Sequence, residues 1–324
     1  MPGRVLVTGA TGFVGGAVVS RLAREGRMAP VAGCRREVVL PAGAEWRRAP
    51  SLGPDADWGD ALHGVDAVVH AAARVHVMDD AVADPLAAYR WANVEGTLAL
   101  ARQAAAVGVR RFVFVSSIKV NGEHTAPGVA FTPADAPAPE DPYGVSKAEA
   151  EAALFALGRE TGMEMVVVRP PLVYGPGVSG NFARLLHWVQ RGVPLPLGAV
   201  DNRRSLVGLD NLVDLLVTCL THPAAAGQVF LVSDGEDLST TDLLRRVAAA
   251  MGRRSRLLPL PPALLRVGAR AVGRGEMARR LLDSLQVDMS HTRETLGWEP
   301  PVSVDEGLRR AVAPLRIGDA GGVA

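Results

Sequence analysis

The sequence has few cysteines and few lysines, and it has no long apolar run. The scarcity of cysteine and the lack of a long apolar run each exclude a class of protein. Cysteine occurs only at Cys34 and Cys219. One disulfide could not organise 324 residues, so reduced thiols in a cytoplasmic protein are expected. No run of about 18 apolar residues exists, which predicts no transmembrane helix and no stable membrane insertion. The apolar stretch from Val5 is broken at Gly9, which argues against a secretion signal.

The chain also lacks a large excess of charge of either sign. The chain carries 35 basic and 34 acidic residues, so no field of a single sign points to nucleic acid as a partner. The 7 histidines lack the cysteine or carboxylate spacing of a zinc site, and we therefore predict no metal. Lysine is confined to Lys119 and Lys147.

The first half of the chain alternates short apolar runs with stretches of helical periodicity. We expect strands at Arg4–Thr8, 30–33, 65–70, 111–116 and Glu164–Arg169, and helices at 14–26, 85–107 and Pro142–Thr161. This alternation predicts an α/β protein with a doubly wound parallel sheet of the Rossmann type. The second half is less regular, with an expected loop at 170–180, a strand at 228–232, and helices at 181–191, 240–251 and 262–282.

A glycine-rich turn joins the first strand to the first helix. Its residues are Thr8-Gly9-Ala10-Thr11-Gly12-Phe13-Val14-Gly15. Gly9 allows the tight turn, Gly12 lets a pyrophosphate approach the backbone, and Gly15 lets the helix pack against the sheet. The N–H groups of the turn and helix start, from Thr11 through Phe13 and Val14, face that anion. An ordinary glycine turn has similar spacing, but the position at a strand-to-helix junction favours a dinucleotide.

The glycine-rich turn and the pattern of elements predict how the chain divides into domains. Residues 1–170, joined by about 205–235, would form the dinucleotide-binding domain. Residues 171–204 and 236–315 would form a smaller C-terminal substrate lobe, and 316–324 a flexible tail.

The residues after the second strand bear on the choice of cofactor. An acidic residue there would bond the ribose of NAD, whereas arginine suits the 2′-phosphate of NADP. The chain has Arg35 and Arg36 there and no carboxylate before Glu37. This favours NADP(H), with NAD(H) possible; the alternative is that both arginines are merely solvated.

Tyr143 and Lys147 form the candidate catalytic pair. They lie four residues apart inside a predicted helix, and therefore on one face of it. An ammonium close to a phenol lowers the phenol's pKa, so we expect the pair to exchange a proton with a carbinol oxygen while hydride moves to or from nicotinamide. A chance Tyr-x-x-x-Lys is uncommon when the chain has 3 tyrosines and so few lysines.

Ser116 and Ser117 end a predicted strand, where ligands of a doubly wound sheet bind. Ser117 could bond the reacting oxygen; strand-end capping is the alternative.

Six motifs then occur in order along the chain: TGATGFVG at 8–15, HAAA at 70–73, NVEGT at 93–97, VSS at 115–117, YGVSK at 143–147 and RPPLVYGP at 169–176. Together they resemble the extended short-chain dehydrogenase/reductase family, the NAD-dependent epimerase/dehydratase group, over about residues 4–315. Within it, the run 117–122 looks like a UDP-glucose 4-epimerase-like subgroup, some of whose members are thought to reduce 4-keto UDP-sugars.

The resemblance implies Ser117, Tyr143 and Lys147 as the catalytic triad. It implies a cofactor site that also includes Ala71, Ala72, Ala73, Asn93, Ser116 and Pro170, and substrate contacts from Ser117, Lys119, Asn181 and Arg204. The expected partners are a nucleotide-sugar substrate and a second copy of the chain in a homodimer.

The sequence departs from the family pattern at three places. The first bears on the reaction, and the other two bear on contacts to the substrate and the adenine. Ile118-Lys119 stands where 4,6-dehydratases carry an acid pair, which argues against dehydration. Leu172 replaces an asparagine common in sugar epimerases, and Ser51-Leu52 replaces an Asp-Leu pair against the adenine.

We therefore predict hydride transfer at a sugar carbon, C4, of a UDP-sugar. NADPH-dependent reduction of a 4-keto sugar is the favoured reaction, and 4-epimerisation is the first alternative. Reduction of a small non-sugar ketone and a non-catalytic nucleotide sensor are the remaining ones. The arginine-rich segment 253–281 is expected to be a solvated lid, with a membrane-surface helix as its alternative.

Overall fold

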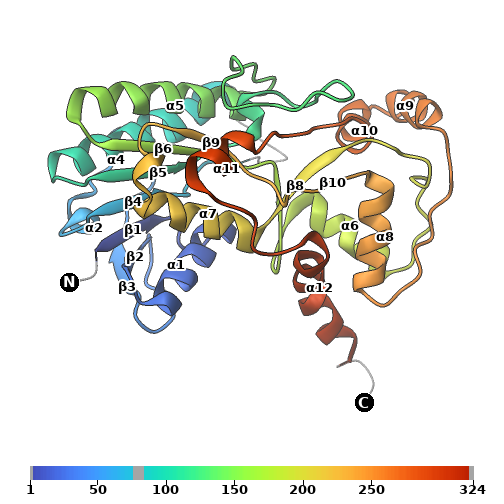
Figure 1. Cartoon of the computed structure of the whole chain (residues 1–324), viewed down its shortest axis with the longest axis horizontal. Helices are drawn as coiled ribbons and strands as arrows, with labels where there is room; N and C mark the ends of the chain where they lie inside the picture. Colours follow the sequence, from blue (N-terminus) through green and yellow to red (C-terminus); the bar gives the residue numbers. More distant parts are fainter. Residues whose placement is uncertain (1–2, 76–83, 321–324) are drawn as a thin grey trace.

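The computed structural model describes residues 3–75 and 84–320. It has two parts, a large sheet with helices on both faces and a smaller lobe beside it (Figure 1). The predicted fold class, a Rossmann-type parallel sheet with a smaller lobe, is confirmed.

The large sheet has seven strands in the order β3-β2-β1-β4-β5-β6-β9, all paired in parallel. They are β1 (Arg4–Thr8), β2 (Ala29–Cys34), β3 (Glu45–Arg48), β4 (Ala67–His70), β5 (Arg111–Val115), β6 (Glu164–Arg169) and β9 (Val229–Leu231). β4 is buried along its whole length, as continuous apolar runs predict. The strand order reverses between β1 and β4, and ligands of doubly wound sheets bind beyond the carboxyl ends of the strands at that point.

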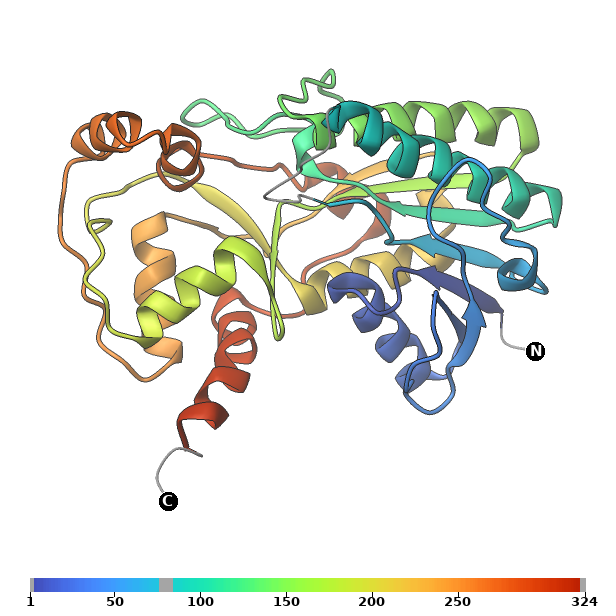
Figure 2. The ribbon, with the colours of Figure 1, turned by 180° about the vertical axis from the view of Figure 1, so that it is seen from behind.

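Helices cover the two faces of this sheet (Figures 1 and 2). One face carries α1 (Phe13–Glu25) and α7 (Leu209–Thr221), which pack apolar side chains against β1 and β6. The other carries α4 (Gly96–Ala106) and α5 (Pro142–Thr161). The short α2 (Gly59–Leu62) and the 3-10 turns Ile118–Val120 and Pro223–Ala225 complete this part.

The helix expected at 85–107 is interrupted. It consists of α3 (Pro85–Tyr89), a π-helical segment η1 (Arg90–Glu95) and α4. Isolated π-helical turns are rare, and nothing in the residue pattern of this segment indicated one. Asn93 lies in the wide turn.

The smaller lobe surrounds a three-stranded sheet of β7 (Leu172–Tyr174), β8 (Arg204–Gly208) and β10 (Asp237–Leu238). The loop expected at 170–180 therefore contains a strand. β8 joins the small sheet, although most of it was expected in the first domain. A third apolar core lies between α6 (Gly180–Gln190), α8 (Thr240–Ala250) and α12 (Val304–Ala320).

The C-terminal helices differ from expectation in two further ways. The helix expected at 262–282 is two helices, α9 (Pro262–Ala271) and α10 (Gly275–Leu282), separated at Gly273, whose φ of 70° favours glycine. α11 (Ser290–Leu296) and α12 were not predicted, and α12 continues to Ala320 within the expected tail. The last four residues lie outside the described ranges. Within those ranges, no helix is both long and apolar enough to cross a bilayer.

Candidate active site

The glycine-rich turn closes tightly against the end of β4. Gly9 has a φ of 65°, and a Cβ there would lie 2.9 Å from the backbone nitrogen of Ala72. A Cβ at Gly15 would lie 2.3 Å from the Gly9 carbonyl oxygen, so only glycine fits at either place. Gly12 is the N-cap of α1 and has no side-chain cap, which leaves the first N–H groups of the helix for an anion. Thr11, Phe13 and Val14 lie around this exposed start. These residues fit a dinucleotide pyrophosphate.

Arginines gather at the carboxyl ends of β2 and β3. β2 ends at Cys34, so exposed Arg35 and Arg36 follow the strand directly. Arg48 ends the neighbouring strand β3, in register with Cys34. Among the described residues, none of the three guanidinium groups has a hydrogen-bond or ion-pair partner. Arg48 was missed from the sequence because β3 was not predicted.

The loop after β4 is held from two sides. The Asn93 side chain accepts from the Arg74 N–H at 2.8 Å and donates to the Arg74 carbonyl at 3.0 Å and to the Ser146 hydroxyl at 3.0 Å. It therefore ties the end of the Ala71–Ala73 segment to α5, the helix that carries Tyr143. On the other side, the Thr8 hydroxyl accepts from the Ala72 N–H at 3.2 Å.

His70 fixes the same loop from below. Its ring contacts the hydroxyls of Thr8 at 2.7 Å and Thr97 at 2.9 Å, and it stacks on Phe114. Complete burial, helped by the nearby charge of Lys147, lowers the pKa of His70 to about 3. His70 is therefore a neutral structural residue.

Tyr143 and Lys147 lie one turn apart near the start of α5, which Asp141 caps through the Gly144 N–H. The Lys147 ammonium lies 5.9 Å from the centre of the Tyr143 ring and donates to the Val115 carbonyl at 2.8 Å. Val115 ends β5, two residues before Ser117. The three residues expected to form the triad are thus gathered at one strand end.

The pKa values of this pair differ from the sequence-based expectation. Burial, the charge of Asp141 and the neighbouring Tyr89 raise the pKa of Tyr143 well above its ordinary value, so the expected lowering by Lys147 is not found. Burial lowers the pKa of Lys147 to about 7, against the opposing effect of Glu151. Tyr143 alone is a neutral phenol, and the Lys147 proton is held weakly enough to exchange near neutral pH.

A buried ion pair supports the strand end from behind. Arg169 donates to the Glu151 carboxylate at 2.6 and 3.0 Å, and both side chains are about 95% buried. Arg169 also donates to Asn121 at 2.9 Å. The Ser116 hydroxyl donates to Glu151 and so joins this buried pair. This pair was missed from the sequence, although Glu151 follows Lys147 by one helical turn.

Ser117 and Pro170 meet beside the catalytic pair. The Ser117 hydroxyl accepts from the Lys119 N–H at 3.2 Å and caps the short turn that follows it. The Pro170 carbonyl, just after β6, accepts from the Ile118 N–H at 3.0 Å. Capping and a role toward substrate are compatible, because the hydroxyl can still donate.

The expected substrate contacts are only partly brought together. Arg204 begins β8, is half-buried and donates to the Asp283 carbonyl at 2.9 Å. Burial lowers its pKa, with Arg280 adding to the effect and Asp283 and Glu123 opposing it. Asn181 is exposed and its side chain contacts Arg184.

Lys119 is engaged elsewhere. Its ammonium pairs with Glu123 at 2.7 Å and with Asp141. Two carboxylates neutralise its charge, which leaves it poorly suited to hold a phosphate.

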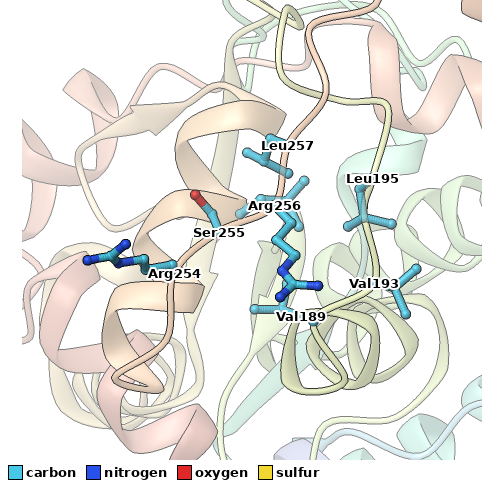
Figure 3. A pocket seen from close by; sticks show the side chains of 9 residues that line it. Val189, Val193, Leu195, Arg254, Ser255, Arg256 and Leu257 are labelled. Carbon is cyan, nitrogen blue, oxygen red and sulfur yellow. The ribbon is translucent and has the colours of Figure 1, made fainter.

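A small hollow in the lobe lies apart from these residues (Figure 3). It is lined by Val189, Gly192, Val193, Leu195, Leu244, Arg254, Ser255, Arg256 and Leu257. No residue of the catalytic set borders it. Within residues 3–75 and 84–320, no group of histidine, cysteine and carboxylate side chains has the arrangement of a metal site.

Known proteins share both the sequence pattern and the fold. The NAD dependent epimerase/dehydratase family matches residues 5–233. A UDP-glucose 4-epimerase of Vibrio cholerae is 47% identical over 311 residues, which cover 96% of this chain and 94% of the relative.

Two solved structures are similar. A short-chain dehydrogenase/reductase superfamily protein of Agrobacterium tumefaciens with bound NAD has a TM-score of 0.74 and 26% identity, and covers 98% of both chains. A UDP-glucose 4-epimerase of Thermotoga maritima with UDP-glucose has a TM-score of 0.74 and 24% identity, covers 97% of this chain and 99% of that one, and supports the fold. Sequence and structure agree that the chain belongs to the NAD dependent epimerase/dehydratase family, as its motif set predicted.

Proposed function

We propose that this enzyme inverts the configuration at C4 of a UDP-sugar, using a nicotinamide cofactor that is recycled within each turnover. The observation that carries the proposal is the gathering of Tyr143, Lys147 and Ser117 at the end of β5, with Arg204 on the lobe that faces it. The 47% identity to the UDP-glucose 4-epimerase of Vibrio cholerae favours this reaction over net reduction. Epimerisation thus replaces the reductase that the sequence alone favoured.

The chain's own residues would carry the proton transfers. Tyr143 accepts the proton of the C4 hydroxyl in the oxidative half and returns it to the 4-keto oxygen in the reductive half. When bound, an oxidised nicotinamide supplies a hydride acceptor and a positive charge. Tyr143, whose pKa is raised by burial, would form its phenolate more readily beside such a charge. Lys147, with a pKa of about 7, can take up the proton that Tyr143 loses when the phenolate forms.

Ser117 and Arg204 would have separate duties. Ser117 donates a hydrogen bond to the reacting oxygen, whose partial charge grows in both halves. Arg204 is a guanidinium on the substrate side, and such a fork suits a diphosphate. A substrate anchored by its diphosphate leaves the hexose free to turn, so that hydride can return to the opposite face of C4.

NADPH-dependent reduction of a 4-keto sugar is the second candidate. Its supporting observation is the set of unpartnered arginines Arg35, Arg36 and Arg48 at the adenosine end. They favour NADP over NAD, and a net reductase draws on NADPH. Either reaction suits the cytoplasmic enzyme that the sequence predicts. The homodimer stays a prediction.

Product analysis separates the two reactions. The purified enzyme is incubated with UDP-glucose, UDP-N-acetylglucosamine and UDP-glucuronic acid, and separately with NADPH and a UDP-4-keto sugar, while absorbance at the reduced-nicotinamide band is followed. Epimerisation predicts conversion to the C4 epimer with no net change in absorbance. Stoichiometric NADPH consumption with a 4-keto sugar, and no epimer, would establish the reductase instead.

A further inference from the structure

Helix α9 (Pro262–Ala271) turns an apolar face outward. Leu264, Val267, Gly268 and Ala271 follow a spacing of three and four residues, which places them on one side of the helix. All four are exposed, with Leu264 at 62% and Val267 at 65%. No residue of α9 is buried. A helix on a water-exposed surface ordinarily shows polar residues on that side.

The opposite side of α9 fixes it to the lobe. Leu265 and Ala269 pack against the third apolar core, and Arg266 pairs with Asp283 at 2.6 Å. The helix is therefore docked, and its outward face is a stable feature of the surface. Its length of 10 residues is half of what a bilayer crossing requires.

Further exposed apolar residues lie close to α9 in the sequence. Leu258, Leu260, Val272 and Met277 are also exposed, before and after α9. These residues and the outward side chains of α9 are named the α9 face. Six large exposed apolar residues of the α9 face fall between 258 and 277. The other large exposed apolar residues lie mostly singly or in pairs elsewhere along the chain. Figures 1 and 2 both show α9 and α10 at the outer end of the smaller lobe, away from the large sheet.

The charge around this face is mostly positive, although Arg266 pairs with Asp283 and Arg279 with Glu140. Between 258 and 282 the chain carries arginines at 266, 270, 274, 279 and 280, and one acidic residue, Glu276. Arg270 and Arg274 are exposed, and among the described residues neither has an ion-pair partner. An apolar helix face rimmed by arginines matches the two layers of a lipid surface, acyl chains below and anionic headgroups above.

We propose that the α9 face docks onto an anionic lipid bilayer, with α9 lying in the plane of the headgroups. Charge complementarity selects this occupant. A second copy of the chain, joined by two-fold symmetry, would bring the same arginines toward one another at an apolar contact, where like charges repel. An anionic bilayer satisfies both the apolar residues and the unpaired cations. Such docking is peripheral and reversible, and it is independent of the reaction that the enzyme catalyses.

Vesicle sedimentation tests the proposal. The full chain is mixed with vesicles of phosphatidylcholine alone or with added phosphatidylglycerol. We expect binding to the anionic vesicles that weakens with salt. Leu264→Glu/Val267→Glu should lower the bound fraction at least about tenfold, because it places two anions on the apolar face. Val107→Glu/Val129→Glu is the matched control, since those valines are similarly exposed (56% and 55%) and lie elsewhere; it should bind like the wild type.

The possible outcomes all bear on the idea. Unchanged circular dichroism and Tm in both double variants would show that lost binding is a surface effect. Absence of wild-type binding to anionic vesicles at low salt would overturn the proposal, as would equal binding by the α9 variant. A change of oligomeric state in the α9 variant by sedimentation velocity, without lipid binding by the wild type, would assign the face to a protein contact instead.

Discussion

In the large sheet domain the ionisable groups nearest the proposed chemistry are buried, whereas in the smaller lobe the important cations stay half-buried or exposed. Lys147, Glu151 and Arg169 are each at least 95% buried. Arg204 is half-buried, and Arg270 lies on the surface. The difference follows from what each part has to do. Proton transfer requires a group whose pKa is set by burial, while recognition of an anion requires a guanidinium that the ligand can reach.

The buried groups of the sheet domain also depend on one another. Glu151 bonds Arg169 and Ser116 and lies one turn from Lys147. Removing one partner of such a pair leaves an uncompensated buried charge, which is strongly destabilising. Substitutions of the lobe's cations should therefore act on substrate binding, and those of the buried groups of the sheet domain on turnover and stability.

Tyr143→Phe should give the largest effect. Loss of the general acid/base is expected to reduce turnover by at least about two orders of magnitude, while UDP affinity stays nearly unchanged. Steady-state kinetics and calorimetry on the same preparation measure the two quantities. Near-normal turnover in the variant would remove Tyr143 from the mechanism and with it the contrast between the two parts.

Arg204→Ala should weaken substrate binding rather than act on the chemical step. Loss of a charge-assisted contact is expected to weaken UDP binding roughly 10- to 100-fold. Arg203→Ala is the control, because Arg203 is adjacent and exposed and only its backbone is bonded. Calorimetry with UDP, in the presence of cofactor, compares the variants. Equal losses in both would mean that no specific diphosphate contact exists at Arg204.

Arg35→Ala should affect one cofactor only. If the arginines at the end of β2 meet a 2′-phosphate, the variant should lose about tenfold in NADP(H) affinity and almost none for NAD(H). Arg27→Ala, exposed beyond α1, controls for net charge. Fluorescence titration of the reduced cofactors gives both affinities. Much tighter binding of NAD than of NADP by the wild type would refute the cofactor preference.

His70 should influence stability without taking part in chemistry. Its folded-state pKa of about 3 lies below the ordinary value of 6.5, so the unfolded chain takes up a proton first as pH falls. The neutral His70 therefore contributes stability above about pH 6.5 that is lost toward pH 3, at up to roughly 1.4 kcal/mol per pH unit. Urea unfolding of wild type and His70→Gln between pH 7 and 4 isolates this loss. Parallel pH profiles would show that His70 is not titrating as described.

The sequence predicted what local spacing encodes. β1, α5 and β6 were predicted with the bounds that the structure has, because continuous apolar runs and the Asp141-Pro142 start are read within a few residues. The glycine turn and the Tyr143–Lys147 pair are equally local. α7 could have been predicted, since its leucines follow helical spacing.

Other features depend on contacts across the fold. The Glu151–Arg169 pair joins residues 18 apart in sequence, and the partners of Lys119 could not be known before Asp141 was placed beside it. The shifted pKa of Tyr143 comes from burial, which spacing does not give. Arg48 depends on the pairing of β3, a strand too short and polar to be predicted.

The fate of the C4 hydrogen tests the central claim most directly. Enzyme with bound cofactor is given a UDP-hexose labelled with deuterium at C4, and the product is examined by mass spectrometry and proton NMR. Our account predicts that the C4 epimer retains the deuterium at C4, because the hydride that is removed is the one that is returned. Loss of the label from C4, or an absence of any epimer from all of the UDP-sugars tested, would contradict the account.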